Sequence, residues 1–216
     1  MKLRAPVVTL AAVVVLGAGL LAVNLAATPT SGTPAAARPI VAAAAPATTA
    51  APEPAPPPVV AEKVWAGRST GREVTVAIAV KGGRAVAYVC DGKKVEAWLQ
   101  GTLTGDQLAL TGPNGARIDG TASEATASGT IAADGRSWPY TAKGVQAPEG
   151  LYEGRADVRG VATRIGWIVV GGTQTGLRRS GGVVAPAPVL DAANPGGVVV
   201  DGSPVTVRSG TELVAS

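Results

Sequence analysis

Two glycine-rich segments have the spacing of a catalytic or phosphate-binding motif. Residues 67–71 read Gly-Arg-Ser-Thr-Gly and match the G-x-S-x-G pattern of a serine nucleophile elbow. That elbow sits between a strand and a helix and needs a histidine partner, whereas this chain has no histidine and a predicted strand follows. Residues 171–176 match the first six positions of a phosphate-binding loop, but Leu177 stands where that loop requires lysine. We therefore interpret both segments as turns.

Cys90 is the only cysteine of the chain, which excludes a disulfide framework and a multi-cysteine metal site within one chain. A reactive thiolate needs a neighbouring base or cation. The alternating pattern around Cys90 instead places it on an apolar strand face, so we predict a core residue. An intermolecular disulfide and a reactive thiol remain the alternatives.

Tryptophans and carboxylates are the remaining candidates for a functional site. The candidate binding residues are Trp98, Trp138 and Trp167, because their rings could line a sugar-stacking surface. Since the chain has no phenylalanine, the same tryptophans are also expected to fill core volume. A carboxylate pair such as Asp91 with Glu96 could serve hydrolysis, although acidic residues scattered through a β domain always offer such pairs.

The composition argues against several classes of function. The absence of histidine removes the residue most often used as a general base and transition-metal ligand. We therefore predict no catalytic residue, no metal and no cofactor. The net charge is +4, but basic residues are adjacent only at positions 93–94 and 178–179, which is not the clustered footprint of a nucleic-acid-binding protein.

Residues 1–27 have the pattern of a transmembrane signal-anchor. Lys2 and Arg4 precede an uncharged stretch from residue 5 to residue 27, and about 20 apolar residues span a bilayer as a helix. A cleaved signal peptide is the alternative, but the end of the stretch lacks a small-x-small cleavage site. We expect a single-pass protein in the cell membrane whose C-terminal part lies outside the cytoplasm, or a secreted protein if the leader is cleaved.

Residues 28–60 are predicted to form a disordered stalk. This segment contains nine prolines, eleven alanines and five threonines. Such a composition cannot bury enough apolar surface to fold, and proline biases it toward extended polyproline II. At about 3.1 Å per residue, the stalk could reach on the order of 100 Å from the membrane.

The chain after residue 60 has the pattern of an all-β protein. Apolar residues alternate with polar or small ones in short runs, and turn dipeptides recur every 8–12 residues. This pattern predicts an antiparallel, hairpin-built barrel or sandwich over residues 61–180. Residues 181–216 are predicted to form a loop and a C-terminal hairpin.

The first hairpin has two possible registers around Gly82-Gly83. A two-residue turn pairs Val80 with Ala85, whereas a three-residue turn pairs Val80 with Val86. The longer turn collects the large apolar residues on one face, together with Tyr88 and Cys90. We therefore predict the three-residue turn, because a slip by one residue would expose that face.

Three segments resemble parts of uncharacterised envelope proteins of actinobacteria. They are residues 87–92 (Ala-Tyr-Val-Cys-Asp-Gly), 96–101 (Glu-Ala-Trp-Leu-Gln-Gly) and 166–169 (Gly-Trp-Ile-Val). The resemblance implies an anchored or secreted chain with an Ala/Pro-rich stalk, and it implies no activity. The predicted function is a non-catalytic module that binds a cell-wall polymer or an envelope protein, with a carboxylate-dependent hydrolase as the alternative.

The leader is predicted to stay attached to the mature protein. The intact mass of protein extracted from membranes should include residues 1–27, because no good cleavage site follows the apolar stretch. Recovery of a soluble form that begins near Thr28 would contradict this prediction.

Overall fold

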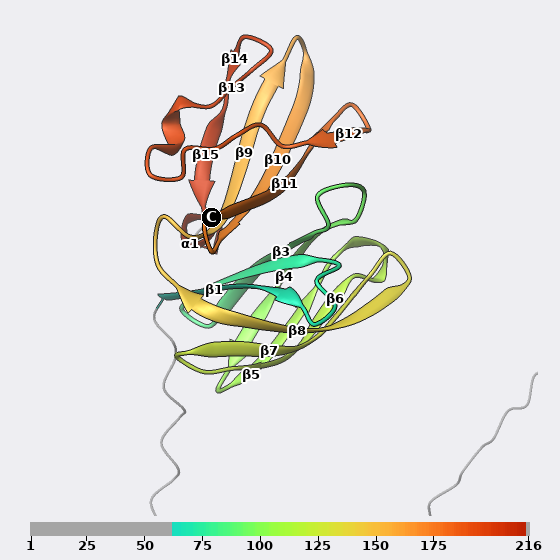
Figure 1. Ribbon diagram of the computed structural model, residues 1–216, viewed down its shortest axis with the longest axis vertical. Coiled ribbons are helices and arrows are strands. Elements are labelled where there is room, and N and C mark those ends of the chain that lie inside the picture. The colour runs from blue at the N-terminus through green and yellow to red at the C-terminus, as the bar shows by residue number, and fades with distance from the viewer. Residues whose placement is uncertain (1–61, 215–216) are drawn as a thin grey trace, which may run out of the picture. The chain divides into compact units, whose positions relative to one another are not determined.

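The computed structural model describes residues 62–214 and shows an all-β protein with very little helix (Figure 1). The predicted membrane anchor and stalk lie outside the described residues. Within the described part of the chain, no helix is both long and apolar enough to cross a membrane. The all-β prediction is confirmed, and the first eight strands form a barrel rather than a sandwich.

The barrel is an antiparallel meander in which each strand pairs with the next and β8 closes onto β1. Its strands are β1 (Glu62–Ser69), β2 (Thr75–Lys81), β3 (Arg84–Cys90), β4 (Glu96–Thr104), β5 (Gln107–Thr111), β6 (Arg117–Ala122), β7 (Thr126–Ala133) and β8 (Arg136–Val145). A short 3-10 turn, η1 (Pro113–Gly115), connects β5 to β6. Closure leaves no free sheet edge in the barrel, because both ends of the meander pair with each other.

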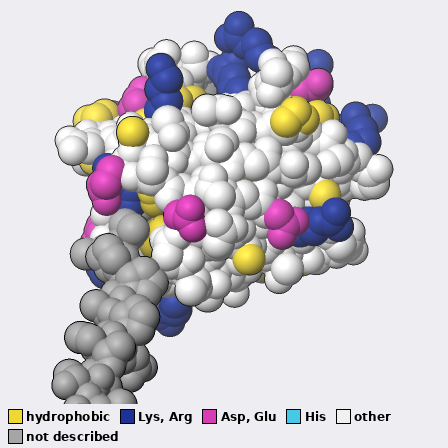
Figure 2. All heavy atoms as spheres, turned by 90° about the horizontal axis from the view of Figure 1, so that it is seen from below, with side chains coloured by type: hydrophobic (Ala, Val, Ile, Leu, Met, Phe, Trp, Pro, Cys, Tyr) yellow, Lys and Arg dark blue, Asp and Glu magenta, His cyan; other side chains and the backbone are white. Residues whose placement is uncertain are grey.

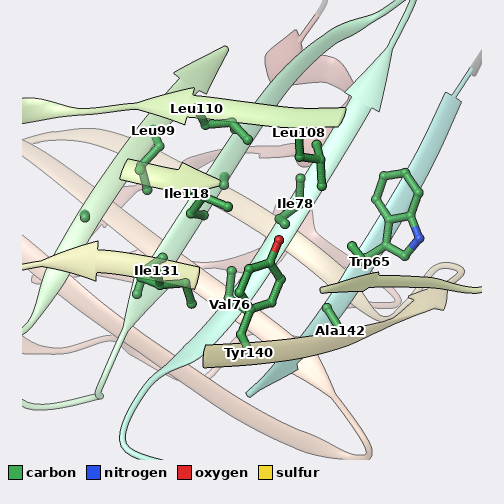
Figure 3. Packing of buried hydrophobic residues seen from close by; sticks show 14 of the residues in the cluster. Trp65, Val76, Ile78, Leu99, Leu108, Leu110, Ile118, Ile131, Tyr140 and Ala142 are labelled. Carbon is green, nitrogen blue, oxygen red and sulfur yellow. The ribbon is translucent and has the colours of Figure 1, made fainter. Parts of the chain in front are cut away.

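Apolar side chains from all eight strands fill the barrel, which is a packed core (Figure 3). Leucine and isoleucine side chains of β2 and β4–β7 point toward one another. Trp65 lies at one side of this core, and its indole N–H donates a hydrogen bond to the Ser123 carbonyl at 3.0 Å. The Tyr140 ring points toward Ile78, and its buried hydroxyl has no hydrogen-bond partner in the described structure. Burial raises the pKa of Tyr140 to about 12, so the hydroxyl stays neutral in this apolar interior.

A second antiparallel sheet follows the barrel, with strand order β12-β11-β10-β9-β15. The remaining elements are β9 (Gly150–Val158), β10 (Val161–Val170), β11 (Thr173–Ser180), β12 (Val183–Pro186), η2 (Pro195–Gly197), β13 (Val199–Val200), β14 (Ser203–Pro204), β15 (Thr206–Ser209) and α1 (Gly210–Val214). Strands β13 and β14 form a small hairpin of their own. The predicted β domain of residues 61–180 thus spans the barrel and β9–β11, and residues 181–214 supply both outer strands of the second sheet.

The first hairpin has the two-residue turn, so the predicted three-residue turn is wrong. Gly82 and Gly83 have φ angles of 58° and 80°, as a two-residue type I′ turn requires. Val80 pairs with Ala85, and Tyr88 lies opposite Ala77. The prediction failed because it assumed one buried face, whereas this hairpin is buried on both faces.

The outer face of β1–β3 packs against the second sheet. The barrel contributes small residues together with Val86, Tyr88 and Cys90. The second sheet contributes Leu151, Ile168 and Leu177, and helix α1 contributes Val214. The Tyr88 ring lies directly on Gly166, where a Cβ atom would come within 2.3 Å of the Tyr88 Cζ atom. Gly166 is therefore required by close approach between the barrel and the second sheet.

Helix α1 is an element that the sequence patterns did not predict. The side chain of Glu212 accepts hydrogen bonds from both the backbone N–H and the hydroxyl of Ser209, at 2.6 Å and 2.8 Å. This arrangement is half of a capping box, and the Ser-x-x-Glu spacing that encodes it is present at residues 209–212. The helix has only five residues, so it is too short for a hydrophobic period to show.

We predict that Gly166→Ala destabilises the protein by about 1–3 kcal/mol, the usual cost of overpacking a core. The added methyl group would force the Tyr88 ring away from the second sheet. Urea unfolding checks this, with Gly197→Ala as the matched control, because nothing lies within 4 Å of the Cβ position at Gly197. Equal stability of the two variants would show that the interface is looser than described.

Candidate functional site

The structure separates the three predicted binding tryptophans. Trp138 is 7% exposed and belongs to the barrel interior. Trp167 is fully buried in a core on the far side of the second sheet, where its indole N–H donates to the Pro188 carbonyl at 2.8 Å. Trp98 is only partly buried and lines a groove between the barrel and the second sheet. The three residues therefore form no common surface.

The groove beside Trp98 has a volume of about 410 Å³. The barrel supplies residues 94–98 and η1, and the second sheet supplies Arg164 and Arg179. These two arginines also line a second hollow of about 590 Å³ over β9–β11, which includes Arg155. The two hollows are therefore adjacent, and we call their combined surface the arginine groove, defined by Glu96, Trp98, Arg155, Arg164 and Arg179.

Three arginines of the groove form a row across the second sheet. Arg164 on β10 pairs directly with Arg155 on β9 and with Arg179 on β11. Side chains directly opposite on antiparallel strands have Cβ atoms about 4.5–5.5 Å apart, and like charges there destabilise a sheet. The row therefore needs compensating negative charge.

Glu153 supplies most of this compensation from within the sheet. Its side chain is 1% exposed and accepts two hydrogen bonds from Arg155, one from Arg164 and one from Arg208. Burial opposes its charge, but the hydrogen bonds and charges of Arg155 and Arg164 outweigh burial and hold the pKa of Glu153 below its usual range. Because folding lowers this pKa, the cluster stabilises the protein at neutral pH and loses that effect as the pH falls through the acidic range.

Glu96 joins the barrel to the third arginine of the row. Its side chain is 5% exposed, and one carboxylate oxygen lies 3.0 Å from Nη2 of Arg179. The other oxygen accepts a hydrogen bond from the Tyr88 hydroxyl at 3.1 Å. Burial raises the pKa of Tyr88, so this hydroxyl stays protonated and remains a donor.

Trp98 fixes the middle arginine of the row. The guanidinium carbon of Arg164 lies 4.0 Å from the centre of the Trp98 ring, which is a close cation–π contact. The Trp98 ring also packs on Tyr88, with 4.3 Å between ring centroids. Its buried indole N–H has no hydrogen-bond partner in the described structure. Tyr88, Trp98 and Arg164 thus form one contact chain from the barrel–sheet interface into the groove.

The other predicted chemical motifs have structural roles. Asp91 and Glu96 are held by different partners: one Asp91 oxygen accepts the backbone N–H groups of residues 93–95, and Glu96 binds Tyr88 and Arg179. Ser69 is buried and donates its hydroxyl to Glu73 at 2.6 Å in the β1–β2 turn, which is not a strand–helix elbow. Gly171 and Gly172 form the β10–β11 hairpin turn, with φ angles of 57° and 68°.

The sequence analysis did not predict the arginine row, because adjacency along the chain does not show which basic residues face each other across neighbouring strands. Two hairpin turns bring the row together, and the Gly171-Gly172 turn already implies the pairing of Arg164 with Arg179. The turn that pairs Arg155 with Arg164 is formed by Arg159 and Gly160, both with positive φ. Counting residues outward from each two-residue turn along both strands shows which arginines face each other, and this count would have predicted the row.

The face of the molecule seen from below shows interspersed charges of both signs and only isolated hydrophobic side chains (Figure 2). Among residues 62–214, no group of three or more histidine, cysteine, aspartate or glutamate side chains could hold a metal ion. Neither family models, nor curated proteins, nor solved structures gave a match to this chain.

We predict that Cys90 reacts with thiol reagents only after unfolding. The structure buries Cys90 completely, beside Val86 and Tyr88 as predicted, but on the opposite face from Val76 and Ile78. Burial raises the pKa of the thiol to about 11, so very little thiolate exists at neutral pH. Labelling kinetics followed by mass spectrometry, with and without urea, check this. Rapid modification of the native protein would contradict the assignment of Cys90 as a core residue.

Proposed function

We propose that this protein is a non-catalytic, membrane-tethered module outside the cytoplasm that binds an envelope polymer or an envelope partner protein through the arginine groove. The observation that carries the proposal is the position of Trp98. It is partly exposed in a groove of about 410 Å³ and sits beside arginines from a different sheet. An aromatic ring beside fixed polar groups in a concave surface is typical of a binding site.

The state of the carboxylates supports binding over hydrolysis. A glycosidase of the two-carboxylate type needs one carboxyl group with a raised pKa as the acid and an ionised partner across the scissile bond. Beneath the groove the pKa of the buried Glu153 is lowered, and the Arg155, Arg164 and Arg208 side chains occupy its oxygens. Glu96 is held by Arg179 and Tyr88.

The predicted anchor and stalk would place this module among the polymers of the envelope. A bilayer anchor at residues 5–27 and an extended segment at residues 28–60 would hold the barrel within reach of envelope polymers. The resemblance to actinobacterial envelope proteins points to the same compartment. Intact mass and membrane extraction test this part of the proposal separately from binding.

The binding proposal is tested with purified full-length protein on isolated cell-wall polysaccharide and peptidoglycan. We expect the polymer to retain the protein, and we expect no soluble sugar or peptide to be released from the polymer. Trp98→Ala should weaken retention by about 0.5–1.5 kcal/mol, the cost of immobilising one long side chain on binding, because Arg164 loses the ring that holds it. Trp98→Phe keeps a ring under Arg164 and should restore part of the retention.

Thermal unfolding of both variants distinguishes a binding defect from a folding defect, because Trp98 also packs on Tyr88. Turnover of the polymer that one Asp or Glu substitution abolishes would overturn the proposal in favour of the hydrolase. Failure of the wild-type protein to be retained on any envelope fraction would overturn it as well.

A further inference from the structure

We infer that the ligand of the arginine groove is an acidic polysaccharide whose carboxylate or phosphate groups bind the row formed by Arg155, Arg164 and Arg179. The inference rests on the proposed function, because it names the chemistry that the same groove recognises. It follows from the number of donors, the charge balance, the extent of the row and the lining of the groove.

The arginines carry more hydrogen-bond donors than the protein uses. Each guanidinium has five N–H donors. Arg155 gives two to Glu153, and Arg164 gives one. Arg179 interacts through Nε and Nη2 with a single oxygen of Glu96. Glu153 already accepts four hydrogen bonds, so the remaining donors need an acceptor from outside the protein or from water.

The charge around the row also has a positive excess. Four arginines, the row together with Arg208, face the two carboxylates of Glu96 and Glu153. The second hollow contains one more acid, Asp157, whose exposed carboxylate accepts the backbone N–H of Gly160 at 2.7 Å in the β9–β10 turn. The first hollow adds one base and one acid, Lys94 and Asp134, whose charges cancel in the count, and Asp134 also pairs with Arg136. The groove therefore keeps a positive excess, while the row side chains stay between 39% and 60% exposed.

The extent of the row favours a polymer over a single small anion. Adjacent strands lie about 4.8 Å apart, so the backbones that carry the three arginines span roughly 10 Å across the sheet. One phosphate or carboxylate group is too small to engage all three. An extended chain with repeated acid groups matches a row that runs through two adjacent hollows.

The lining of the second hollow, over β9–β11, favours a polysaccharide over an acidic protein. Stable protein interfaces have an apolar core rich in large side chains. The hollow over β9–β11 is lined by arginine, aspartate and threonine together with alanine, glycine and proline, and it has no large apolar side chain. Polar sugar rings with acid substituents suit such a surface, because they bring hydroxyl groups and charge rather than apolar anchors.

The inference is tested with three polymers that share one backbone: neutral dextran, carboxymethyl-dextran and dextran phosphate. Full-length protein in a neutral detergent should bind at least one acidic dextran, should lose binding as salt is raised, and should not bind neutral dextran. A preference for carboxymethyl-dextran assigns a carboxylate polymer, and a preference for dextran phosphate assigns a phosphate polymer. Poly-L-glutamate serves as the acidic protein probe.

Arg155→Gln is the critical variant, with Arg117→Gln as its matched control. Both side chains are similarly exposed, at 60% and 62%, and Arg117 lines neither hollow. Arg155→Gln should weaken binding to the acidic dextran by about tenfold, the order expected for a lost charge-assisted hydrogen bond, and Arg117→Gln should not. If Arg155→Gln lowers the thermal unfolding midpoint, Arg179→Gln takes its place, and the same loss of binding to the acidic dextran is expected.

Four results with the defined polymers would overturn the inference: equal binding of neutral and acidic dextran, no binding of either acidic dextran, tighter binding of poly-L-glutamate, or equal loss in the Arg117→Gln control. Retention on envelope material that Arg155→Gln and Arg179→Gln leave unchanged would overturn the inference and leave the proposed function standing. Binding of acidic dextran through Arg155 without retention on any envelope fraction would instead overturn the proposed function.

Discussion

The structure depends on one hairpin that is buried on both of its faces. Residues 75–80 of β2 are all buried, and their side chains alternate between the barrel interior and the second sheet. This double burial makes β2–β3 a wall shared by two hydrophobic cores. The double burial holds the Tyr88 ring against Gly166, and the Tyr88 ring packs on the Trp98 ring at the edge of the groove. The groove therefore exists because the second sheet packs on the outside of a closed barrel.

The arginine row runs against the ordinary rules of sheet stability. Three like charges stand directly opposite one another, an arrangement that destabilises a sheet unless counter-charges are supplied. Glu153 is buried to supply them, and burying a carboxylate is itself costly unless several hydrogen bonds hold it. Each feature offsets the cost of the other, and packed apolar residues in place of such a cluster are often neutral or stabilising for the fold. Local conflicts of this kind concentrate at functional sites, where binding rather than stability decides the residues.

Much of the fold, but little of the site, could be predicted from the sequence. Alternating apolar residues and turn dipeptides predicted the strands, because both signals are local. The register around Gly82-Gly83 was predicted wrongly, because alternation cannot reveal that a second sheet covers the outer face. Trp98 was among the candidate residues, but its separation from Trp138 and Trp167 depends on tertiary packing. The arginines of the row are nine and fifteen residues apart along the chain, and only hairpin pairing brings them together.

The contacts that hold the arginines also prepare them for binding. A free arginine side chain loses about 2 kcal/mol of rotamer entropy when it is fixed, which reduces the affinity it contributes. Here the Trp98 ring and the Glu153 carboxylate already fix Arg164, Glu153 fixes Arg155, and Glu96 fixes Arg179. Part of that entropy is therefore lost on folding rather than on binding. Because the arginines are held in place before the ligand binds, they favour a ligand whose acid groups are spaced as the arginines are. The rigidity of the sheet therefore contributes to selectivity for the ligand.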